Sequence, residues 1–368
     1  MATPILPRDV ADRPGAVSAN DAMVDLLMER AIDLLRLEAG TRDKVVVLLD
    51  DLEREIVAKL AAMDPTGPAR VQYQRLRLTK LLAQIDASIK ATYRLNDTLL
   101  AQEIREVVDI EATWTASAIN SSVQADFADI GITRGLLTTL ISDVLIQGAP
   151  TKEWWGRQAA GLSDKFADEM RRGVAIGENN GALVKRARGV MDLARSSAER
   201  LVRSSVQTAA NAARESTYEQ NTDLISALQW SATLDTRTSI WCITRDGHTY
   251  DVKTHEPQDD GPPWLDGPGA LHWGCRSTSV PVLKSWRDLG IDENEVPETT
   301  RASMDGQVAV GLTFEQWLRK QTVARQDDVL GQGKADLWRS GKITFRDLLD
   351  QNGRPLTTEQ LRAKAARK

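Results

Sequence analysis

Both cysteines and all three histidines of the chain lie within residues 234–282. Two of them form a His-x-x-Cys unit, His272 to Cys275, a spacing that lets two side chains bind one tetrahedral metal from a single tight turn. Cys242 lies upstream of this unit in the same segment. Because thiolate sulfur and imidazole nitrogen are ligands that zinc prefers, Cys242, His272 and Cys275 are candidate metal ligands.

A longer pattern surrounds these three residues. In chain order it comprises Asp235, Arg237, Ser239, Cys242, Asp246, Gly247, Pro262, Pro263, His272, Cys275 and Arg276. This order resembles that of the Mu-type minor head morphogenesis proteins of tailed bacteriophages. Their pattern runs Asp-x-Arg-x-Cys-x-x-Cys, then Asp-Gly, Pro-Pro and His-x-x-Cys-Arg. The resemblance covers about residues 130 to 350, and Ser239 occupies the place of its first cysteine.

The serine at position 239 leaves three metal ligands. The fourth would be water, Asp235, Asp246 or His248. The segment would then be either a zinc site with three protein ligands or a packed knuckle without metal. The missing cysteine favours the knuckle without metal. A catalytic zinc also keeps an open position. However, the sequence has no helical His-Glu-x-x-His and no paired carboxylates at defined spacing, so we expect no enzymatic activity and no certain cofactor.

Charged and turn residues frame this segment. Asp235, Arg237 and Arg276 are the residue types of an ion-paired brace, and Asp235 could equally cap the turn that leads to Cys242. Short apolar runs, Ile240 to Ile243 and Tyr250 to Val252, lie on either side of Asp246-Gly247 and predict strands joined by a hairpin turn there.

Upstream of the knuckle the pattern is helical. Residues 1–19 predict a flexible arm, and residues 20–130 a helical docking region. A first helix begins near Asp21 and is expected to break at Gly40-Thr41. Residues 69–130 contain neither glycine nor proline, so they predict one or two long helices, used as a bundle core or as a rod for assembly contacts.

The rest of the chain completes an α+β fold that is predominantly helical. Long N-terminal helices precede a central helical and small-sheet domain, residues 131–300, which contains the Cys/His knuckle, residues 234–282. Residues 301–368 predict a helical C-terminal tail.

Charge and composition limit the classes of function. Hydrophobic residues make up 42% of the chain, charged residues 27%, and the formal net charge is −5, which argues against a protein that coats DNA with its whole surface. We predict no membrane span and no signal peptide. In a reducing compartment the two cysteines would be free, metal-bound or redox-sensitive rather than a structural disulfide. A Cys242–Cys275 disulfide is the alternative if the protein ends in a virion outside the cell.

One stretch is locally basic. Between Arg157 and Arg214 there are 11 Lys or Arg residues against 6 Asp or Glu residues. This excess is typical of a solvated helix face. The alternative is contact with packaged DNA or with an acidic partner surface, and the candidate residues are Arg186, Arg188, Arg200 and Arg203.

The resemblance implies a function. It implies a minor structural protein of a phage head, present in a few copies at or near the portal and acting in head morphogenesis and in genome packaging or ejection. Its partners would be the portal protein, other head proteins and packaged DNA, without a membrane. It would pass from the host cytoplasm to the head interior of the virion. The alternative is a nucleic-acid-binding or metal-dependent nuclease-like protein, and a second is an effector carried in the virion.

Overall fold

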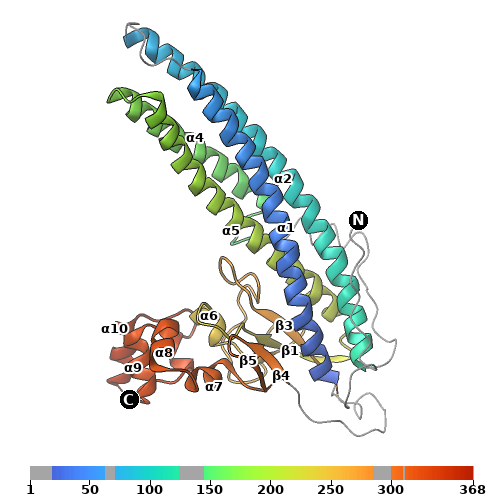
Figure 1. Cartoon of the computed structure of the whole chain (residues 1–368). Helices are drawn as coiled ribbons and strands as arrows, with labels where there is room; N and C mark the ends of the chain where they lie inside the picture. The colour runs from blue at the N-terminus through green and yellow to red at the C-terminus, as the bar shows by residue number, and fades with distance from the viewer. Residues whose placement is uncertain (1–18, 63–70, 124–144, 285–299, 310, 368) are drawn as a thin grey trace. The chain divides into compact units, whose positions relative to one another are not determined.

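The computed structural model describes residues 19–62, 71–123, 145–284, 300–309 and 311–367 (Figure 1). Within these ranges four long helices come first, and small antiparallel sheets and short helices follow. This confirms the predicted class, a predominantly helical α+β fold with a small central sheet. The predicted arm, residues 1–19, lies outside the described residues except for its last position.

The first two helices are α1 (Ala19–Ala61) and α2 (Val71–Val123). Their buried apolar residues recur at intervals of three and four, the spacing of one helix face. Examples are Val45, Leu49, Leu52, Ile56 and Leu60 in α1 and Leu78, Leu81, Ile85 and Ile89 in α2. The predicted long helix after residue 69 is thus a single helix as far as Val123.

The break expected at Gly40-Thr41 is wrong, because α1 runs through both residues. A single glycine in a helix costs only about 1 kcal/mol relative to alanine, which a long buried face offsets. Thr41 is also held inside the helix. Its hydroxyl lies 3.1 Å from the carbonyl oxygen of Leu37 and 3.0 Å from a carboxylate oxygen of Glu103.

Two further helices follow, α4 (Thr151–Ala175) and α5 (Asn180–Gln220). Gly177 lies between them with a φ of +75°, a conformation that side chains with a Cβ rarely adopt. A Cβ on Gly173 would lie 2.5 Å from Cδ2 of Leu183. The two helices therefore approach each other closely at Gly173, where a larger residue would require the Leu183 and Glu178 side chains to shift.

A three-stranded antiparallel sheet follows α5. It consists of β1 (Ile225–Ser231), β2 (Thr249–Tyr250) and β3 (Thr278–Leu283) in the order β2-β1-β3. Leu228 of β1 pairs with Tyr250, and Gln229 pairs with Val280. The central strand β1 thus pairs with one strand from the middle of the knuckle and one from its C-terminal end.

The predicted strand at Ile240–Ile243 is wrong: these residues form a single helical turn, α6 (Ile240–Ile243). Ser239 precedes it with an extended backbone. The turn at Asp246-Gly247 is present, with Gly247 at a φ of +83°, but it joins α6 to β2 rather than two strands. Apolar residues favour a strand locally, but the N–H groups of Cys242 and Ile243 donate to the carbonyl oxygen of Ser239, both at 3.0 Å, and close a helical turn instead.

The sheet buries an aromatic group. Trp264 packs edge-on against Trp230 and Tyr250, with ring centroids 5.3 and 4.9 Å away, and stacks on His255 at 4.6 Å. Tyr250 donates a hydrogen bond to the carbonyl oxygen of Pro262. The Pro/Gly-rich loop before His272 is therefore fixed to the sheet through an aromatic core.

The C-terminal segment begins with a hairpin that the sequence prediction missed, β4 (Thr300–Ser303) and β5 (Gly306–Ala309). The predicted helices follow as α7 (Phe314–Arg319), α8 (Val323–Leu330), α9 (Gln332–Arg339), the 3-10 turn η2 (Arg346–Leu348) and α10 (Thr358–Ala365). Capping boxes start α7 and α10, in which Thr313 and Thr357 bind back to Gln316 and Gln360.

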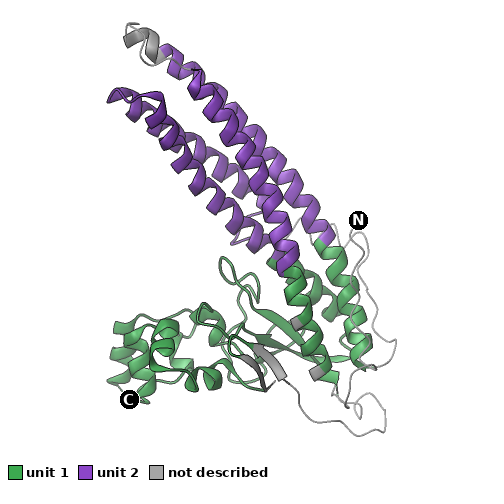
Figure 2. Ribbon diagram, viewed as in Figure 1, with its two compact units in different colours: residues 1–34, 107–140, 207–368 green, residues 35–106, 141–206 purple. Residues whose placement is uncertain are grey.

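The chain divides into two compact units (Figure 2). Unit 1 comprises residues 1–34, 107–140 and 207–368, and unit 2 comprises residues 35–106 and 141–206. The sheet, the knuckle and the C-terminal helices all belong to unit 1. Among the described residues, no helix is long and apolar enough to span a membrane.

Candidate metal centre

The His-x-x-Cys unit forms one tight turn. The backbone N–H of Cys275 donates to the carbonyl oxygen of His272 at 3.1 Å, and Gly274 has a φ of +69°. A turn with a positive φ at its third residue favours glycine at that position. This local geometry directs the side chains of His272 and Cys275 to the same side.

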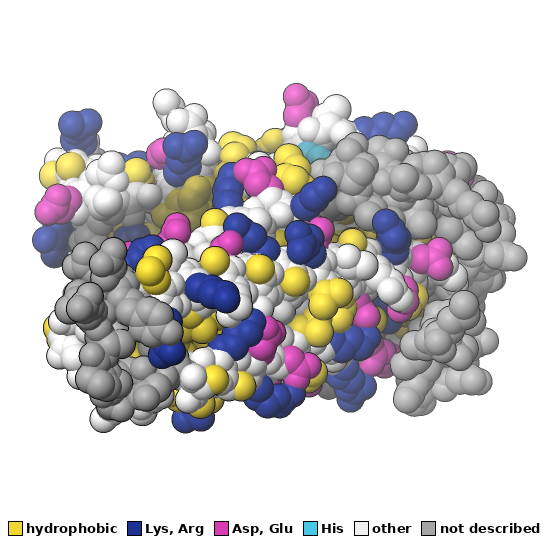
Figure 3. Space-filling model, turned by 90° about the horizontal axis from the view of Figure 1, so that it is seen from above, with side chains coloured by type: hydrophobic (Ala, Val, Ile, Leu, Met, Phe, Trp, Pro, Cys, Tyr) yellow, Lys and Arg dark blue, Asp and Glu magenta, His cyan; other side chains and the backbone are white. Residues whose placement is uncertain are grey.

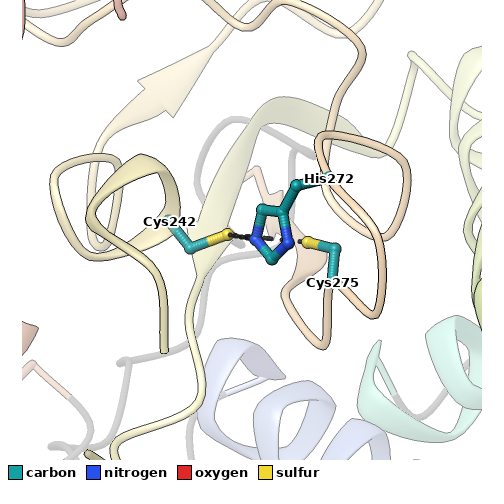
Figure 4. Close-up of side chains that lie close together, drawn as sticks. All are labelled: Cys242, His272 and Cys275. Atoms are coloured by element: carbon teal, nitrogen blue, oxygen red, sulfur yellow. Dashed lines mark hydrogen bonds between the residues drawn. The ribbon is translucent and has the colours of Figure 1, made fainter. Parts of the chain in front are cut away.

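Cys242 reaches the same point from α6. Its Sγ lies 3.1 Å from Nε2 of His272 and 3.5 Å from Sγ of Cys275, and both cysteine side chains are buried. The three side chains point toward one another (Figure 4), and their ligand atoms all lie within 4.8 Å of one another. The structure therefore brings the three sequence-predicted ligands together.

Backbone groups orient the ligands. Nδ1 of His272 lies 3.1 Å from the carbonyl oxygen of Trp273, which as an acceptor places the ring proton on Nδ1 and leaves Nε2 free to coordinate. The N–H of Gly269 donates to Sγ of Cys275 at 3.3 Å. Gly269 has a φ of +80°, and a Cβ there would lie 2.2 Å from Nδ2 of Asn211. This donor was not among the predicted site residues, although the Gly-Pro-Gly run at residues 267–269 indicates a turn there.

The two thiols differ in their protonation. The hydrogen bond between them lowers the pKa of Cys275 well below its ordinary value and raises the pKa of Cys242. Burial lowers the pKa of His272, but the hydrogen bond and the negative charge of Cys275 outweigh it, and the net shift is upward. The group therefore places the more acidic of the two thiols beside an imidazole, and thiol and imidazole are the ligand types of a zinc site.

Ser239 completes the group as a fourth polar side chain. Its Oγ lies 2.7 Å from Nε2 of His272. Ser239, Cys242 and His272 line a small pocket whose cavity volume is about 10 Å³. This is room for about one water-sized occupant, so the pocket fits an ion or a water but no organic substrate.

The spacing can be compared with that of a tetrahedral zinc site. Zinc–sulfur bonds of about 2.3 Å and zinc–nitrogen bonds of about 2.0 Å separate two sulfurs by roughly 3.8 Å and a sulfur from a nitrogen by roughly 3.5 Å. The corresponding distances here are 3.5 and 3.1 Å. The residues fit the ion after the ligand atoms move apart by a few tenths of an ångström.

The ion-paired brace forms between Asp235 and Arg276. The guanidinium donates to both carboxylate oxygens of Asp235, at 2.6 and 2.8 Å. The N–H of Arg237 and the hydroxyl of Thr238 donate to the same carboxylate, whereas the Arg237 side chain is 82% exposed. Burial raises the pKa of Asp235, but the hydrogen bonds and charge of Arg276 outweigh it and the pKa is lowered.

None of the three residues proposed as a fourth ligand joins the Cys/His group. Asp235 is bound to Arg276 as described. The carboxylate of Asp246 accepts the N–H groups of Ala232 and Phe314, both at 2.7 Å. His248 pairs with Asp259 at 3.0 Å. Of the four alternatives, water remains, and the Ser239 hydroxyl supplies a protein oxygen 2.7 Å from Nε2 of His272.

Arg245 is a structural residue that the sequence analysis did not single out. Its guanidinium is fully buried and donates to the carbonyl oxygens of Trp241, Pro263 and Gly353. It thereby ties α6 to the Pro/Gly-rich loop and to the C-terminal segment. No local sequence signal distinguishes such an arginine, because its three acceptors are backbone groups far apart in the chain.

Three of the four candidate DNA-contact arginines are ion-paired within unit 2. Arg186 binds Glu178 and Glu169, Arg188 lies 3.4 Å from Glu53, and Arg203 lies 3.7 Å from Glu38. Within the described ranges Arg200 has no ion pair, and it is exposed. Figure 3 shows Asp and Glu side chains interspersed with Lys and Arg side chains on the face seen from above.

Comparison with known proteins identifies one family. Residues 164–280 match the family model of Phage Mu protein F like protein. The segment runs from within α4 into β3, so it contains Cys242, His272 and Cys275, and it is shorter than the predicted 130 to 350. Curated proteins and solved structures give no match. The match confirms the resemblance seen in the sequence and supports a Mu F-like phage head protein.

Proposed function

We propose that this chain is a minor structural protein of a phage head, bound at or near the portal and acting in head morphogenesis and in genome packaging or ejection. The single observation that carries the proposal is the Mu F-like match over residues 164–280. Head proteins are its proposed partners, the portal protein among them, and a few copies enter each virion. The protein assembles in the host cytoplasm and stays in the head interior.

Three parts of the chain have separate proposed roles. The helices within residues 20–130 dock the protein on its partners, residues 131–300 form the Mu F-like domain, and residues 301–368 form a C-terminal tail. The long helices support the first assignment, because helices of 43 and 53 residues offer extended surfaces for contact.

The test is particle assembly without the chain. Deleting its gene from the phage should yield heads that are aberrant or lack packaged genome, and expression of the full chain in trans should restore them. Tagged chain should then be located by a symmetry-relaxed particle map as density at the portal vertex. Normal infectious heads in the deletion, or density elsewhere in the particle, would contradict the proposal.

We also propose that the knuckle binds zinc as a structural ion, held by Cys242, His272 and Cys275. When bound, the ion would cross-link α6 to the His-x-x-Cys turn and stabilise a small sheet. The chain's own contribution is the oriented imidazole, the thiolate of Cys275 and the hydrogen bond from Gly269.

Zinc affinity, measured by competition with a chromophoric chelator, tests this assignment. Ser239→Cys should raise the affinity sharply, because a fourth thiolate completes a closed tetrahedral site. Ser226→Cys is the matched control, since it adds a thiol at an exposed position of β1. Equal affinities of the two variants would show that Ser239 no longer faces the ligand group in solution.

A structural role also predicts no hydrolytic turnover on DNA, peptide or nucleotide substrates, because the small pocket next to His272 excludes them. Metal-dependent DNA cleavage that disappears in His272→Ala would contradict it. If the arginines contact packaged DNA, binding should weaken steeply with salt and show little sequence preference. Arg200→Ala is the informative variant, since Arg200 is exposed.

A further inference from the structure

The two sulfur atoms of the knuckle are close enough to react with each other. Cys242 and Cys275 are 33 positions apart in sequence, yet their Sγ atoms lie 3.5 Å apart. A disulfide bond is about 2.05 Å long, so the sulfurs need to approach by roughly 1.5 Å. The movement involves α6, which is one helical turn, and a tight turn that contains Gly274.

The pocket next to the sulfurs decides which reagent reaches them. Cys242 lines it together with Ser239 and His272, whereas Cys275 lies behind, fully buried. A cavity volume of about 10 Å³ admits a molecule of about the size of water. Hydrogen peroxide has two oxygen atoms, and the oxygen that reacts needs about the room of one water. A glutathione-sized disulfide is far too large for the pocket.

We infer that Cys242 and Cys275 form an intramolecular disulfide when the chain, free of metal, meets a peroxide. The thiol proton of Cys242 passes to Nε2 of His272, 3.1 Å from the sulfur, and the sulfur attacks one peroxide oxygen. An S–O bond forms, the O–O bond breaks, and the departing oxygen takes up the proton and leaves as water. The sulfur of Cys275 then attacks the sulfenic sulfur of Cys242. An S–S bond forms, the S–O bond breaks and a second water leaves, with both sulfurs oxidised and one peroxide reduced.

The disulfide would replace the metal as the cross-link of the knuckle. Both sulfurs are used in either state, so the two states exclude each other. The bond would join the same two elements, α6 and the His-x-x-Cys turn, and would suit a particle that has left the reducing host cytoplasm. The knuckle would therefore keep a covalent brace where thiols are oxidised.

Thiol counting on the reduced, chelator-treated full chain tests the inference directly, because the sequence contains two cysteines and no more. After exposure to hydrogen peroxide, free thiols should fall from two to none per chain. The intact mass should fall by the two lost hydrogens, and a proteolytic digest should contain a peptide pair linked through Cys242 and Cys275. Dithiothreitol should restore both thiols.

The controls separate this bond from other oxidation products. Cys242→Ser and Cys275→Ser should each prevent the loss of two hydrogens, and glutathione disulfide should react much more slowly than peroxide with the unaltered chain. Two thiols that persist under peroxide, sulfinic acid in place of the linked peptide, or a disulfide-linked dimer as the main product would each overturn the inference. These readouts need only the unaltered chain, so they hold even if a variant fails to fold.

Discussion

The helices of unit 2 and the knuckle of unit 1 bury different kinds of side chain. In unit 2, buried positions of α1 and α2 follow the helical repeat and are mostly apolar, as at Leu49 and Ile85. In the knuckle, the buried positions include Arg245 and Asp246, whose charged groups bind backbone atoms. Burial of apolar surface tolerates small shifts, whereas a buried charge needs every partner in place.

This difference determines how the stability of each region depends on the residues around it. Each turn of a unit 2 helix satisfies its own backbone, so its residues need only a hydrophobic neighbour. The knuckle has only short helices and strands. Its side chains therefore form hydrogen bonds with backbone groups that longer elements would pair with one another. Its stability should therefore depend on a few polar residues rather than on the sum of many apolar ones.

The largest effect is expected for Asp246→Ala. Its carboxylate accepts the N–H groups of Ala232 and Phe314. Removal leaves two buried donors without this acceptor and should lower the free energy of unfolding by about 4 kcal/mol. Asp246→Asn keeps one acceptor oxygen and should lose less. Urea unfolding checks both, and equal small losses would refute the view that the knuckle depends on buried charge.

A slightly smaller effect, about 3 kcal/mol, is expected for Leu49→Ala, because the side chain is fully buried and its removal leaves a cavity. Val47→Ala is the matched control two residues away, where the side chain is 55% exposed and the change should stay within about 0.5 kcal/mol. Hydrogen exchange in α1 measures both. Similar effects at the two positions would mean that α1 does not bury this face in solution.

Glu215 gives a pH-dependent prediction for the polar surroundings of the knuckle. Burial raises its pKa to about 8, and it accepts a hydrogen bond from Ser279 at 3.3 Å. Since the folded pKa exceeds the unfolded value, its contribution to stability is full below about pH 4.5 and is lost as the pH rises through about 8.

The matched variant is Glu215→Gln, which stays neutral at every pH. The stability of the unaltered chain relative to this variant should fall between about pH 4.5 and pH 8, as measured by chemical unfolding across that range. A difference that stays constant with pH would show that Glu215 is ionised in the folded protein.

The smallest effect is expected for Arg188→Ala in unit 2. The Arg188 side chain is 62% exposed and lies 3.4 Å from Glu53. A solvated ion pair of this kind contributes less than about 0.5 kcal/mol, so the unfolding midpoint should barely change. A loss as large as that of Leu49→Ala would show that charge pairs, rather than apolar packing, stabilise these helices.

The sequence by itself determined the long helices and the composition of the Cys/His group. Spacing of three and four predicted α1 and α2, because a helix forms its hydrogen bonds within four residues and a local pattern suffices. The order of Cys242, His272 and Cys275 predicted their convergence, and the structure confirms it. The glycine at position 40 misled the prediction, since one weak helix former cannot overcome a long buried face.

Tertiary structure alone decided what surrounds that group. Asp235 pairs with Arg276, the Asp246 carboxylate accepts a hydrogen bond from the N–H of Phe314, and the Ser239 hydroxyl contacts the His272 ring. The partners are 41, 68 and 33 residues apart in sequence. Residues 240–243 became a helical turn although their composition favours a strand. These choices depend on hydrogen bonds between distant segments. A local pattern carries no information about such partners, because each polar side chain has several acceptable ones until the fold brings one of them within reach.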